Sequence, residues 1–299
     1  MQEKFYLRSR VKLFGLVEIF KSKESDDKRR RRYYVFGVPF AERMFSLELA
    51  ERERLAEGQN SEEEKIATIT LPAFSLHREV FPKYRGICAG KEVVVVGAGP
   101  TLDDYIPISG AIHIGVNKTF LCEKLSLDYL FIQDYFEDIQ DAADAYRPKA
   151  CKKFYGYHPD GNVGAIPEVC ATRAGAERYF FEDLPLSSHH PFPPDISRAR
   201  FGTFSSVIFP ALQFALWMHP KRIYLVGCDC TSLGHCRGIT TKTSVKPKLP
   251  LATKRVLHGW HELKKFAERF YPDVEIVSVN PVGLKGVFRD MKTQNAEIQ

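Results

Sequence analysis

Four consecutive valines, Val93 to Val96, restrict the fold of this chain more than any other feature. They form an uninterrupted β-branched run that ends at the turn Gly97-Ala98-Gly99-Pro100. A short apolar strand that stops at a glycine-rich turn is typical of a strand buried on both faces, and such strands occur in parallel sheets covered by helices. The sequence therefore predicts an α/β domain with a doubly wound, mainly parallel, Rossmann-like sheet.

Further apolar segments follow in the order that such a sheet requires. We expect strands at 111–116, 128–132, 222–226 and 274–279, and helices at 204–218 and 262–270. Ligands of doubly wound sheets bind beyond the carboxyl ends of the strands. Those ends carry Gly97, Asn117, Asp134, Asp229 and Asn280. This edge of the sheet is therefore the expected place of the chemistry.

The turn after the valine run suits a phosphate group, because Gly97 and Gly99 allow close backbone approach and a helix start supplies free N–H groups. Thr101 is placed to cap that helix. A tight turn of purely structural purpose is the alternative. The dinucleotide fingerprint asks for a small residue where Leu102 stands and, about 20 residues on, a carboxylate where Asn117 stands. These differences disfavour NAD and S-adenosylmethionine, and the absence of a GxxxxGK[ST] motif disfavours a P-loop kinase.

The strand end at Asp229 predicts chemistry without a metal. A metal-dependent sugar transferase is expected to show Asp-x-Asp there, whereas the chain reads Cys228-Asp229-Cys230, and a single carboxylate is a poor Mg²⁺ site. Cys236 and His235 lie nearby, but their spacing differs from that of zinc sites. We interpret the cysteines as buried residues at a strand end, and we expect neither a metal nor a cofactor.

Two histidines are the predicted catalytic residues. His258 and His261 flank Trp260 just before the expected last helix, after a basic loop at 242–254 that we interpret as a mobile lid. An imidazole of ordinary pKa accepts a hydroxyl proton at neutral pH, so His258 is the first candidate for the general base. The other histidines considered are His189, His190 and His235.

The positive charge is concentrated at the start of the chain. Residues 1–43 hold twelve lysines and arginines against six acidic residues, which accounts for the whole net charge of +6. We expect residues 1–73 to be a basic extension, with a short strand at 33–40, a helix and a flexible joint near 58–61, and residues 74–299 to be the catalytic domain. The run Lys28, Arg29, Arg30, Arg31, Arg32 suits an anionic membrane surface. By charge alone, the run is equally compatible with nucleic-acid binding or with a solvated segment that has no partner. We expect no nucleic-acid partner.

The location is predicted from what the sequence lacks. No apolar run reaches the ~20 residues that cross a bilayer, no secretory signal is evident, and seven scattered cysteines favour a reducing compartment. We expect a cytoplasmic protein, peripheral at the inner face of the cytoplasmic membrane.

Four short motifs resemble, in order and spacing, those of the bacterial sialyltransferase-like group. They are GAGPTL at 97–102, GVN at 115–117, RFGTFSS at 200–206 and IYLVGCD at 223–229. That group includes Campylobacter-type lipooligosaccharide sialyltransferases, motility-associated flagellin glycosyltransferases and archaeal hydroxymethylpterin pyrophosphokinases. The segment RRYYVFGVPF at 31–40 also resembles the leader of cell-surface polysaccharide glycosyltransferases.

The resemblance implies a metal-independent, inverting transfer of a nonulosonic-acid-type sugar from a CMP-activated donor to a glycan or glycolipid at the cell surface. It implies nucleotide contacts from Gly97, Gly99, Pro100, Thr101, Asn117, Thr203, Ser205, Ser206 and Asp229. Gln133, Asp134 and Arg200 would contact the donor or acceptor sugar, and His258 or His261 would be catalytic. The tyrosines that this group places after the Gly-x-Asp strand end are missing from 231–243, where Arg237, Thr241 or Lys242 would substitute for them.

Two other functions remain open. A pyrophosphokinase of the same fold would transfer diphosphate from ATP and hold Mg²⁺ with Asp134 and Asp229. A non-catalytic nucleotide-binding protein of envelope assembly would use the arginine run as its membrane contact.

Overall fold

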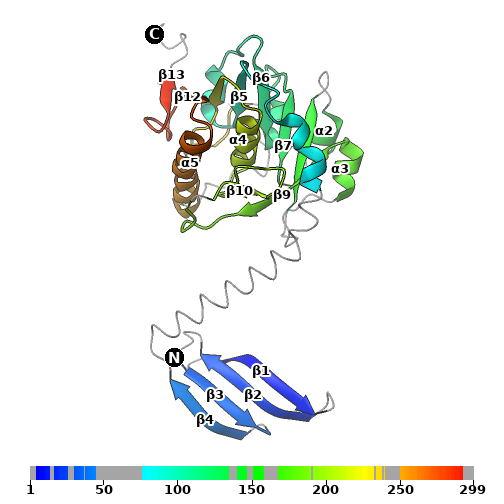
Figure 1. Ribbon diagram of the computed structural model, residues 1–299, viewed down its shortest axis with the longest axis vertical. Coiled ribbons are helices and arrows are strands. Elements are labelled where there is room, and N and C mark those ends of the chain that lie inside the picture. Colours follow the sequence, from blue (N-terminus) through cyan, green and yellow to red (C-terminus); the bar gives the residue numbers. More distant parts are fainter. Residues whose placement is uncertain are drawn as a thin grey trace. The chain divides into compact units, whose positions relative to one another are not determined.

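A computed structural model describes residues 5–13, 17–25, 30–36, 38–44, 76–134, 140–146, 151–157, 168–189, 191–231, 234–237, 239 and 250–291 (Figure 1). The chain forms two compact units, Met1–Ile69 and Thr70–Gln299.

The N-terminal unit contains a four-stranded antiparallel sheet. Its strands β1 (Phe5–Leu13), β2 (Val17–Ser25), β3 (Arg30–Val35) and β4 (Val38–Met44) pair in chain order. The expectation of one short strand was therefore wrong. The alternation of Phe5, Leu7, Val11 and Leu13 has the period of a strand, but Ser9 interrupts it. Arg30 to Arg32 lie in β3, whereas Lys28, Arg29, the expected helix and the joint at 58–61 fall outside the described residues.

The C-terminal unit contains a nine-stranded sheet, all of whose neighbours are parallel. The strands are β5 (Glu92–Val96), β6 (Ile112–Val116), β7 (Tyr129–Ile132), β8 (Lys152–Tyr157), β9 (Glu177–Asp183), β10 (Phe201–Thr203), β11 (Arg222–Val226), β12 (Glu275–Val279) and β13 (Arg289–Met291). Their order is β10-β9-β8-β7-β6-β5-β11-β12-β13. The chain thus builds outward from β5 on one side and then from β11 on the other, which confirms the doubly wound fold and places its switch point between β5 and β11.

Helices cover both faces of this sheet (Figure 1). In the described part of the chain, residues 76–80 are α-helical, and the α-helices with assigned bounds are α2 (Gln140–Ala145), α3 (Glu168–Ala174), α4 (Ile208–Trp217) and α5 (Pro250–Phe270). The 3-10 helices are η1 (Pro82–Tyr84), η2 (Pro100–Asp104) and η3 (Asn117–Leu121). Val93 and Val95 belong to the apolar cluster that contains α4 and part of α5, whereas Val94 and Val96 belong to the cluster on the opposite face. The valine run is therefore buried on both faces, and its four side chains are completely inaccessible to solvent.

The predicted strands at 111–116, 128–132, 222–226 and 274–279 are confirmed to within one residue at each end. The last helix was predicted too short, because α5 begins twelve residues before position 262. Val256, Trp260, Leu263 and Ala267 are buried at helical spacing and continue the stripe toward the amino end. His258 consequently lies inside α5 rather than before it.

The expected lid at 242–254 is described only at 250–254, which are the first residues of α5; residues 242–249 lie outside the described part of the chain. Among the described residues, no helix combines the length and the apolar character needed to cross a bilayer.

Candidate functional site

The two turns at the switch point contact each other through their backbones. The Gly97 N–H donates to the Val226 carbonyl at 2.7 Å, and the Gly99 N–H donates to the Gly227 carbonyl at 2.8 Å. A Cβ atom on Gly97 would lie 2.5 Å from the Gly227 carbonyl oxygen, and one on Gly99 would lie 2.1 Å from Asp229 Oδ2. Both glycines are therefore required by the packing of one turn against the other.

Asp229 joins these turns at the start of η2. Its Oδ2 accepts the Thr101 N–H at 3.0 Å, its Oδ1 accepts the Thr101 hydroxyl at 2.5 Å, and the residue is 4% exposed. The expected cap by Thr101 was wrong: Gly99 is the N-cap residue and makes no side-chain cap, Pro100 occupies the first turn, and the first-turn N–H of Thr101 is accepted by Asp229. The Thr101 side chain is instead committed to Asp229. This carboxylate is thus a buried anchor of the turn.

Asn117 connects the ends of β6 and β7. Its φ of 45° is in the left-handed region, which asparagine tolerates better than most residues. Its Nδ2 donates to Asp134 Oδ2 at 2.8 Å, and its Oδ1 accepts the Gln133 N–H at 3.1 Å. The amide therefore fixes the positions of Gln133 and Asp134.

Within the part of the chain that the structure describes, two buried polar atoms near Asn117 and Asp134 have no hydrogen-bond partner. They are Nε2 of Gln133 and the hydroxyl of Tyr179, a residue of β9. A Cβ on Gly156 of β8 would lie 2.8 Å from Gln133 Cγ and 2.9 Å from the Tyr179 hydroxyl, so both side chains pack over the same glycine. Burial, and then the Asp134 charge, raises the Tyr179 pKa well above its ordinary value. A buried donor without a partner is costly, and a ligand oxygen would satisfy it.

The loop after β10 is held by Asp183 at the end of β9. The Thr203 hydroxyl accepts the Ser206 N–H at 3.1 Å, which closes the turn. Ser205 has a φ of 57°, and its N–H donates to Asp183 Oδ1 at 2.7 Å. Arg255 of α5 pairs with Asp183 Oδ2 at 3.0 Å. One carboxylate thereby ties the Ser205 loop to helix α5.

His258 lies on α5 beside this loop. Its ring centroid is 5.4 Å from that of Phe204, with the rings edge to face. The contact is close because the next residue is Gly259, on which a Cβ would lie 2.6 Å from Phe204 Cδ2 and 2.6 Å from Phe209 Cζ. The His258 Nε2–H donates to the Ser188 carbonyl at 2.9 Å, so the neutral ring has its lone pair on Nδ1.

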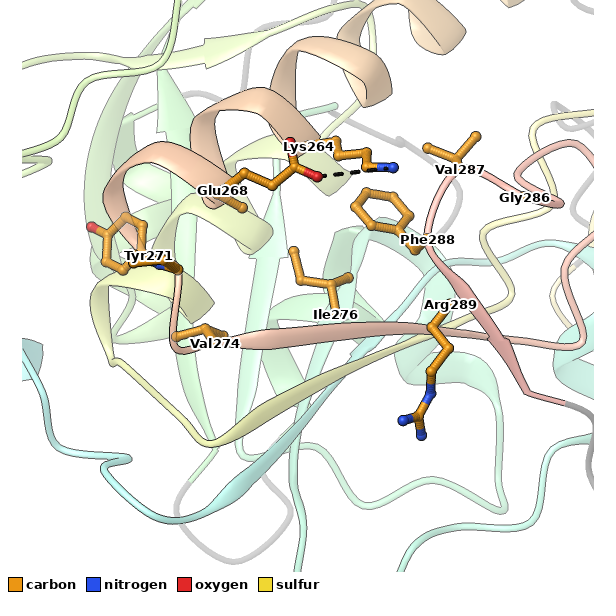
Figure 2. Close-up of a pocket in the computed structure, with 11 residues that line it drawn as sticks. Lys264, Glu268, Tyr271, Val274, Ile276, Gly286, Val287, Phe288 and Arg289 are labelled. Carbon is orange, nitrogen blue, oxygen red and sulfur yellow. Dashed lines mark ion pairs between the residues drawn. The ribbon is translucent and has the colours of Figure 1, made fainter.

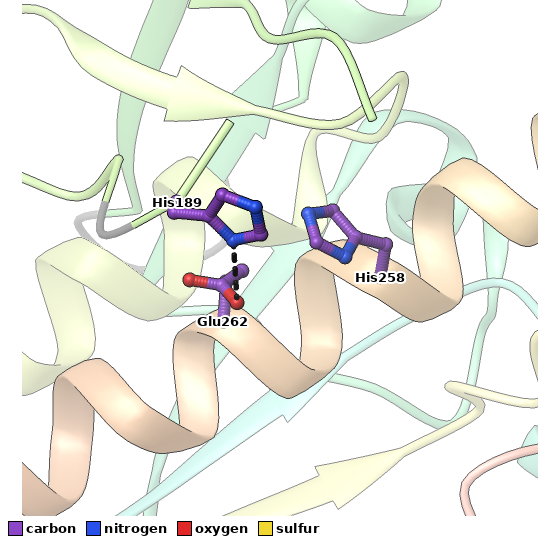
Figure 3. A group of neighbouring side chains, drawn as sticks. All are labelled: His189, His258 and Glu262. Carbon is purple, nitrogen blue, oxygen red and sulfur yellow. Dashed lines mark ion pairs between the residues drawn. The ribbon is translucent and has the colours of Figure 1, made fainter. Parts of the chain in front are cut away.

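Two residues lie beside His258 that the sequence did not identify as its neighbours. The donor atoms of His189, His258 and Glu262, which we call the α5 triad, lie within 4.8 Å of one another (Figure 3). Glu262 is 1% exposed and accepts from Lys265 at 2.7 Å. His258 and Glu262 are four residues apart, a spacing that places both on one helix face. That signal was hidden because the helix was expected to begin at position 262.

The remaining predicted residues lie apart from these contacts. Arg200 precedes β10 and pairs with Glu182 Oε2 at 3.3 Å. His261 is exposed on α5 and is not a member of the α5 triad. Arg237 pairs with Asp103, whereas Thr241 and Lys242 lie outside the described residues. Burial raises the pKa of the Cys228 thiol well above its ordinary value, and that of Cys236 to about 12.

The predicted residues thus gather in two groups at the carboxyl edge of the sheet. The switch-point group comprises Gly97, Gly99, Pro100, Thr101, Asn117, Gln133, Asp134 and Asp229, at the ends of β5, β6, β7 and β11. The helix-side group comprises Thr203, Ser205, Ser206 and His258, at the end of β10 and on α5. Strands β8 and β9 lie between β7 and β10 in the sheet.

A cavity of about 320 Å³ lies elsewhere, between α5, β12 and β13 (Figure 2). Ile276, Val287 and Phe288 give it an apolar wall, and Lys264 and Glu268 of α5 form an ion pair at its rim, 3.9 Å apart. None of the residues that line it was predicted from the sequence to belong to the functional site.

Comparisons with known proteins give limited similarity. No protein-family model matches the chain, and no curated protein sequence does. Among solved structures, a variant of the sialyltransferase CstII in complex with CMP is 14% identical, with a TM-score of 0.39 over 63% of this chain and 81% of that one. CstII from Campylobacter jejuni in complex with the substrate analogue CMP-3FNeuAc is 16% identical, with a TM-score of 0.41 over 67% of this chain and 85% of that one. At these values neither likeness assigns an activity to this chain.

Proposed function

We propose that this protein is a glycosyltransferase that moves a nonulosonic-acid-type sugar from a CMP-activated donor to a glycan or glycolipid of the cell surface. The observation that supports it most is the placement of the four sequence motifs. Although they are spread from position 97 to position 229, each of them includes or adjoins the carboxyl end of a strand of one parallel sheet. Ligands of doubly wound sheets bind along that edge.

The switch-point group takes the nucleotide in this proposal. Asn117 and Asp229 act mainly by holding the turns, since their side-chain atoms bond to Asp134, Gln133 and Thr101. Gln133 offers a donor to the ligand, because its buried Nε2 has no hydrogen-bond partner among the described residues. That N–H suits a phosphate or sugar oxygen of the donor.

The helix-side group performs the transfer in this proposal. His258 accepts the proton of the acceptor hydroxyl at Nδ1, the nitrogen that does not contact Ser188. The hydroxyl oxygen attacks the anomeric carbon from the face opposite the phosphate, which inverts its configuration. CMP leaves as a phosphate monoester. In this proposal the Ser206 hydroxyl, which accepts the Ile208 N–H, donates its hydrogen to the developing charge. Thr203 and Ser205 shape the loop that presents it, since the Ser206 N–H donates to the Thr203 hydroxyl and the Ser205 N–H donates to Asp183. A nucleoside monophosphate is a competent leaving group without a metal.

The pyrophosphokinase alternative requires carboxylates that are free to hold Mg²⁺. Both oxygens of Asp229 accept hydrogen bonds from Thr101, and Asp134 Oδ2 accepts one from Asn117. These contacts favour anchoring over Mg²⁺ binding. No contact of the described residues favours a non-catalytic nucleotide-binding protein of envelope assembly.

The basic N-terminal unit indicates where the proposed enzyme is located. We infer that Lys28 to Arg32 bind anionic lipid headgroups and hold the enzyme at the inner face of the cytoplasmic membrane. Charge supports this, since the excess of basic residues lies within positions 1–43.

Substitution of the two α5 histidines tests the catalytic part. His258→Ala is expected to lower kcat by roughly a hundredfold to ten-thousandfold with little change in donor affinity, because proton removal matters on the way to the transition state. His261→Ala is the matched control, since His261 lies on the same helix and is exposed. A His258→Ala enzyme with near-normal kcat would remove the general base from this position.

A further inference from the structure

We propose that the α5 triad of His189, His258 and Glu262 is a binding site for a divalent transition-metal ion of the Zn²⁺ class. This inference goes beyond the proposed transfer reaction and does not depend on it. It rests on the donor set, on the geometry of α5 and on the burial of Glu262.

The donor set suits zinc. Two imidazoles and one carboxylate are ligands that Zn²⁺ accepts, with a fourth position left to water. Zinc to nitrogen and zinc to oxygen distances of about 2.0–2.2 Å put neighbouring ligand atoms roughly 3.4 Å apart in a tetrahedral site. The three donor atoms lie within 4.8 Å of one another, so closure by somewhat more than an ångström completes the site. His189 supplies that movement most easily, since its side chain is 69% exposed.

Two elements bring the ligands together (Figure 3). His258 and Glu262 are one turn apart on α5, and a spacing of four residues presents both side chains on one helix face. His189 approaches from the loop after β9, and its Nδ1 lies 3.8 Å from Glu262 Oε1. The helix therefore supplies a rigid pair of ligands, and the loop supplies the third.

Glu262 is the residue that distinguishes this group from an ordinary surface cluster. Its side chain is 1% exposed, and a carboxylate in such a place needs positive charge close by. Lys265 supplies one such charge at 2.7 Å, through a side chain that is itself 55% exposed. A metal ion beside the two histidines adds positive charge on the side of the carboxylate that faces them.

The hydrogen bond of His258 matches that of a metal ligand. Ligating histidines commonly give their other ring N–H to a backbone carbonyl, which fixes the tautomer and the ring orientation. The Ser188 carbonyl accepts the His258 Nε2–H at 2.9 Å and has this effect. The neighbour of Ser188 is His189, so the segment that orients one ligand also carries another.

The proposal predicts a relation between metal binding and catalysis. A histidine nitrogen that binds a metal cannot accept a proton, so Zn²⁺ on the α5 triad and general-base action by His258 exclude each other. If the proposed function is correct, the ion inhibits the enzyme. Metal binding itself is measured without substrate, so failure of the proposed function and failure of the metal site are separate results.

The test measures Zn²⁺ binding to the full-length protein by equilibrium dialysis, in the absence of nucleotide. One Zn²⁺ per chain is expected. His189→Ala and Glu262→Gln are each expected to weaken binding by about 100-fold or more, since loss of even an outer partner costs 10–100-fold. His261→Ala is the matched control and should bind as the wild type does.

Two further measurements keep the result unambiguous. Co²⁺ in place of Zn²⁺ should give visible bands without the intense near-ultraviolet band of a thiolate ligand, which separates this site from the seven cysteines. Tryptophan fluorescence checks that each variant is folded; if Glu262→Gln is not, the exposed His189 carries the test alone. Absence of Zn²⁺ binding, equal binding by His189→Ala, or a thiolate band from Co²⁺ would each overturn the proposal.

Discussion

His77 makes the stability of the C-terminal unit depend on pH. This histidine is completely buried, and its Nδ1–H donates to the carbonyls of Ile196 and Ala199 at 2.9 and 2.8 Å. Its Nε2 accepts the Phe180 N–H at 2.8 Å. The ring is therefore held as the neutral Nδ1–H tautomer, because protonation of Nε2 would place two N–H groups against each other. Burial lowers the His77 pKa from 6.5 to about 4, although the two carbonyls act in the opposite direction.

The sign and size of the effect follow from this difference. Between pH 6.5 and about pH 4 the unfolded chain binds a proton at His77 and the folded chain does not, so stability falls as the pH falls. At 1.36 kcal/mol for each pKa unit, the complete loss is about 3 kcal/mol. About 2 kcal/mol of it is expected between pH 7.5 and pH 5.

The assay compares urea unfolding of the wild type and of His77→Gln at several pH values between 7.5 and 5. The chain has two tryptophans, Trp217 and Trp260, and both are buried in the C-terminal unit, so their fluorescence reports on that unit. The variant removes one titrating group, and titrations common to both proteins, such as that of His113, cancel in the difference.

The difference in unfolding free energy between the two proteins should shrink by about 2 kcal/mol as the pH falls from 7.5 to 5. A difference that stays constant across this range would refute the reasoning, because it would mean that His77 takes up a proton equally well in the folded and unfolded chains.

Three other predictions concern packing, thiol chemistry and membrane binding. Gly259→Ala should lower the unfolding free energy by about 1–3 kcal/mol, because its Cβ would lie 2.6 Å from Phe204 and Phe209. Phe204→Leu should restore part of that loss, and an unchanged unfolding free energy in Gly259→Ala would contradict the close approach of α5. In the folded protein at pH 8, Cys151 and Cys236 should react with iodoacetamide about a thousandfold more slowly than in the urea-unfolded chain, because burial raises the pKa of both thiols to about 12. Rapid labelling of the folded protein at these cysteines would disprove that burial. A chain that begins at residue 70 should lose salt-sensitive binding to anionic vesicles; unchanged binding would place the membrane contact elsewhere.

The sheet was predictable because its strong signals are local. Val93 to Val96 are β-branched, consecutive and followed by glycines, and this pattern alone identifies a central parallel strand. Strand β8 escaped prediction because it contains Lys153, which is 3% exposed. Its ammonium donates to the Ala143 and Asp144 carbonyls at 3.0 and 2.6 Å, at the end of α2. The hydrophobic pattern of β8 does not predict that its lysine is buried, because the carbonyls that accept from this lysine belong to another element.

The candidate site was predictable in part for the same reason. Asn117 follows an apolar strand directly and Asp229 comes three residues after the end of another, so the sequence places both at the sheet edge. Their partners, Asp134 and Thr101, are 17 and 128 residues away along the chain and are brought close by the fold. The α5 triad was missed because the last helix was expected to begin at position 262, which left His258 outside it, whereas α5 begins at Pro250. In the structure Gly259 lets α5 approach Phe204 closely.

The most direct test of the proposed function is release of CMP from a CMP-activated nonulosonic acid in the presence of EDTA, followed by ³¹P NMR. The proposal predicts that the CMP phosphate monoester signal grows in proportion to enzyme, that a glycan acceptor accelerates it, and that ¹H NMR of the product shows an inverted anomeric centre. His261→Ala should retain this activity, and His258→Ala should lose it. The contrary result is an enzyme that leaves the CMP-sugar intact, with or without acceptor, and instead consumes ATP only when Mg²⁺ is present.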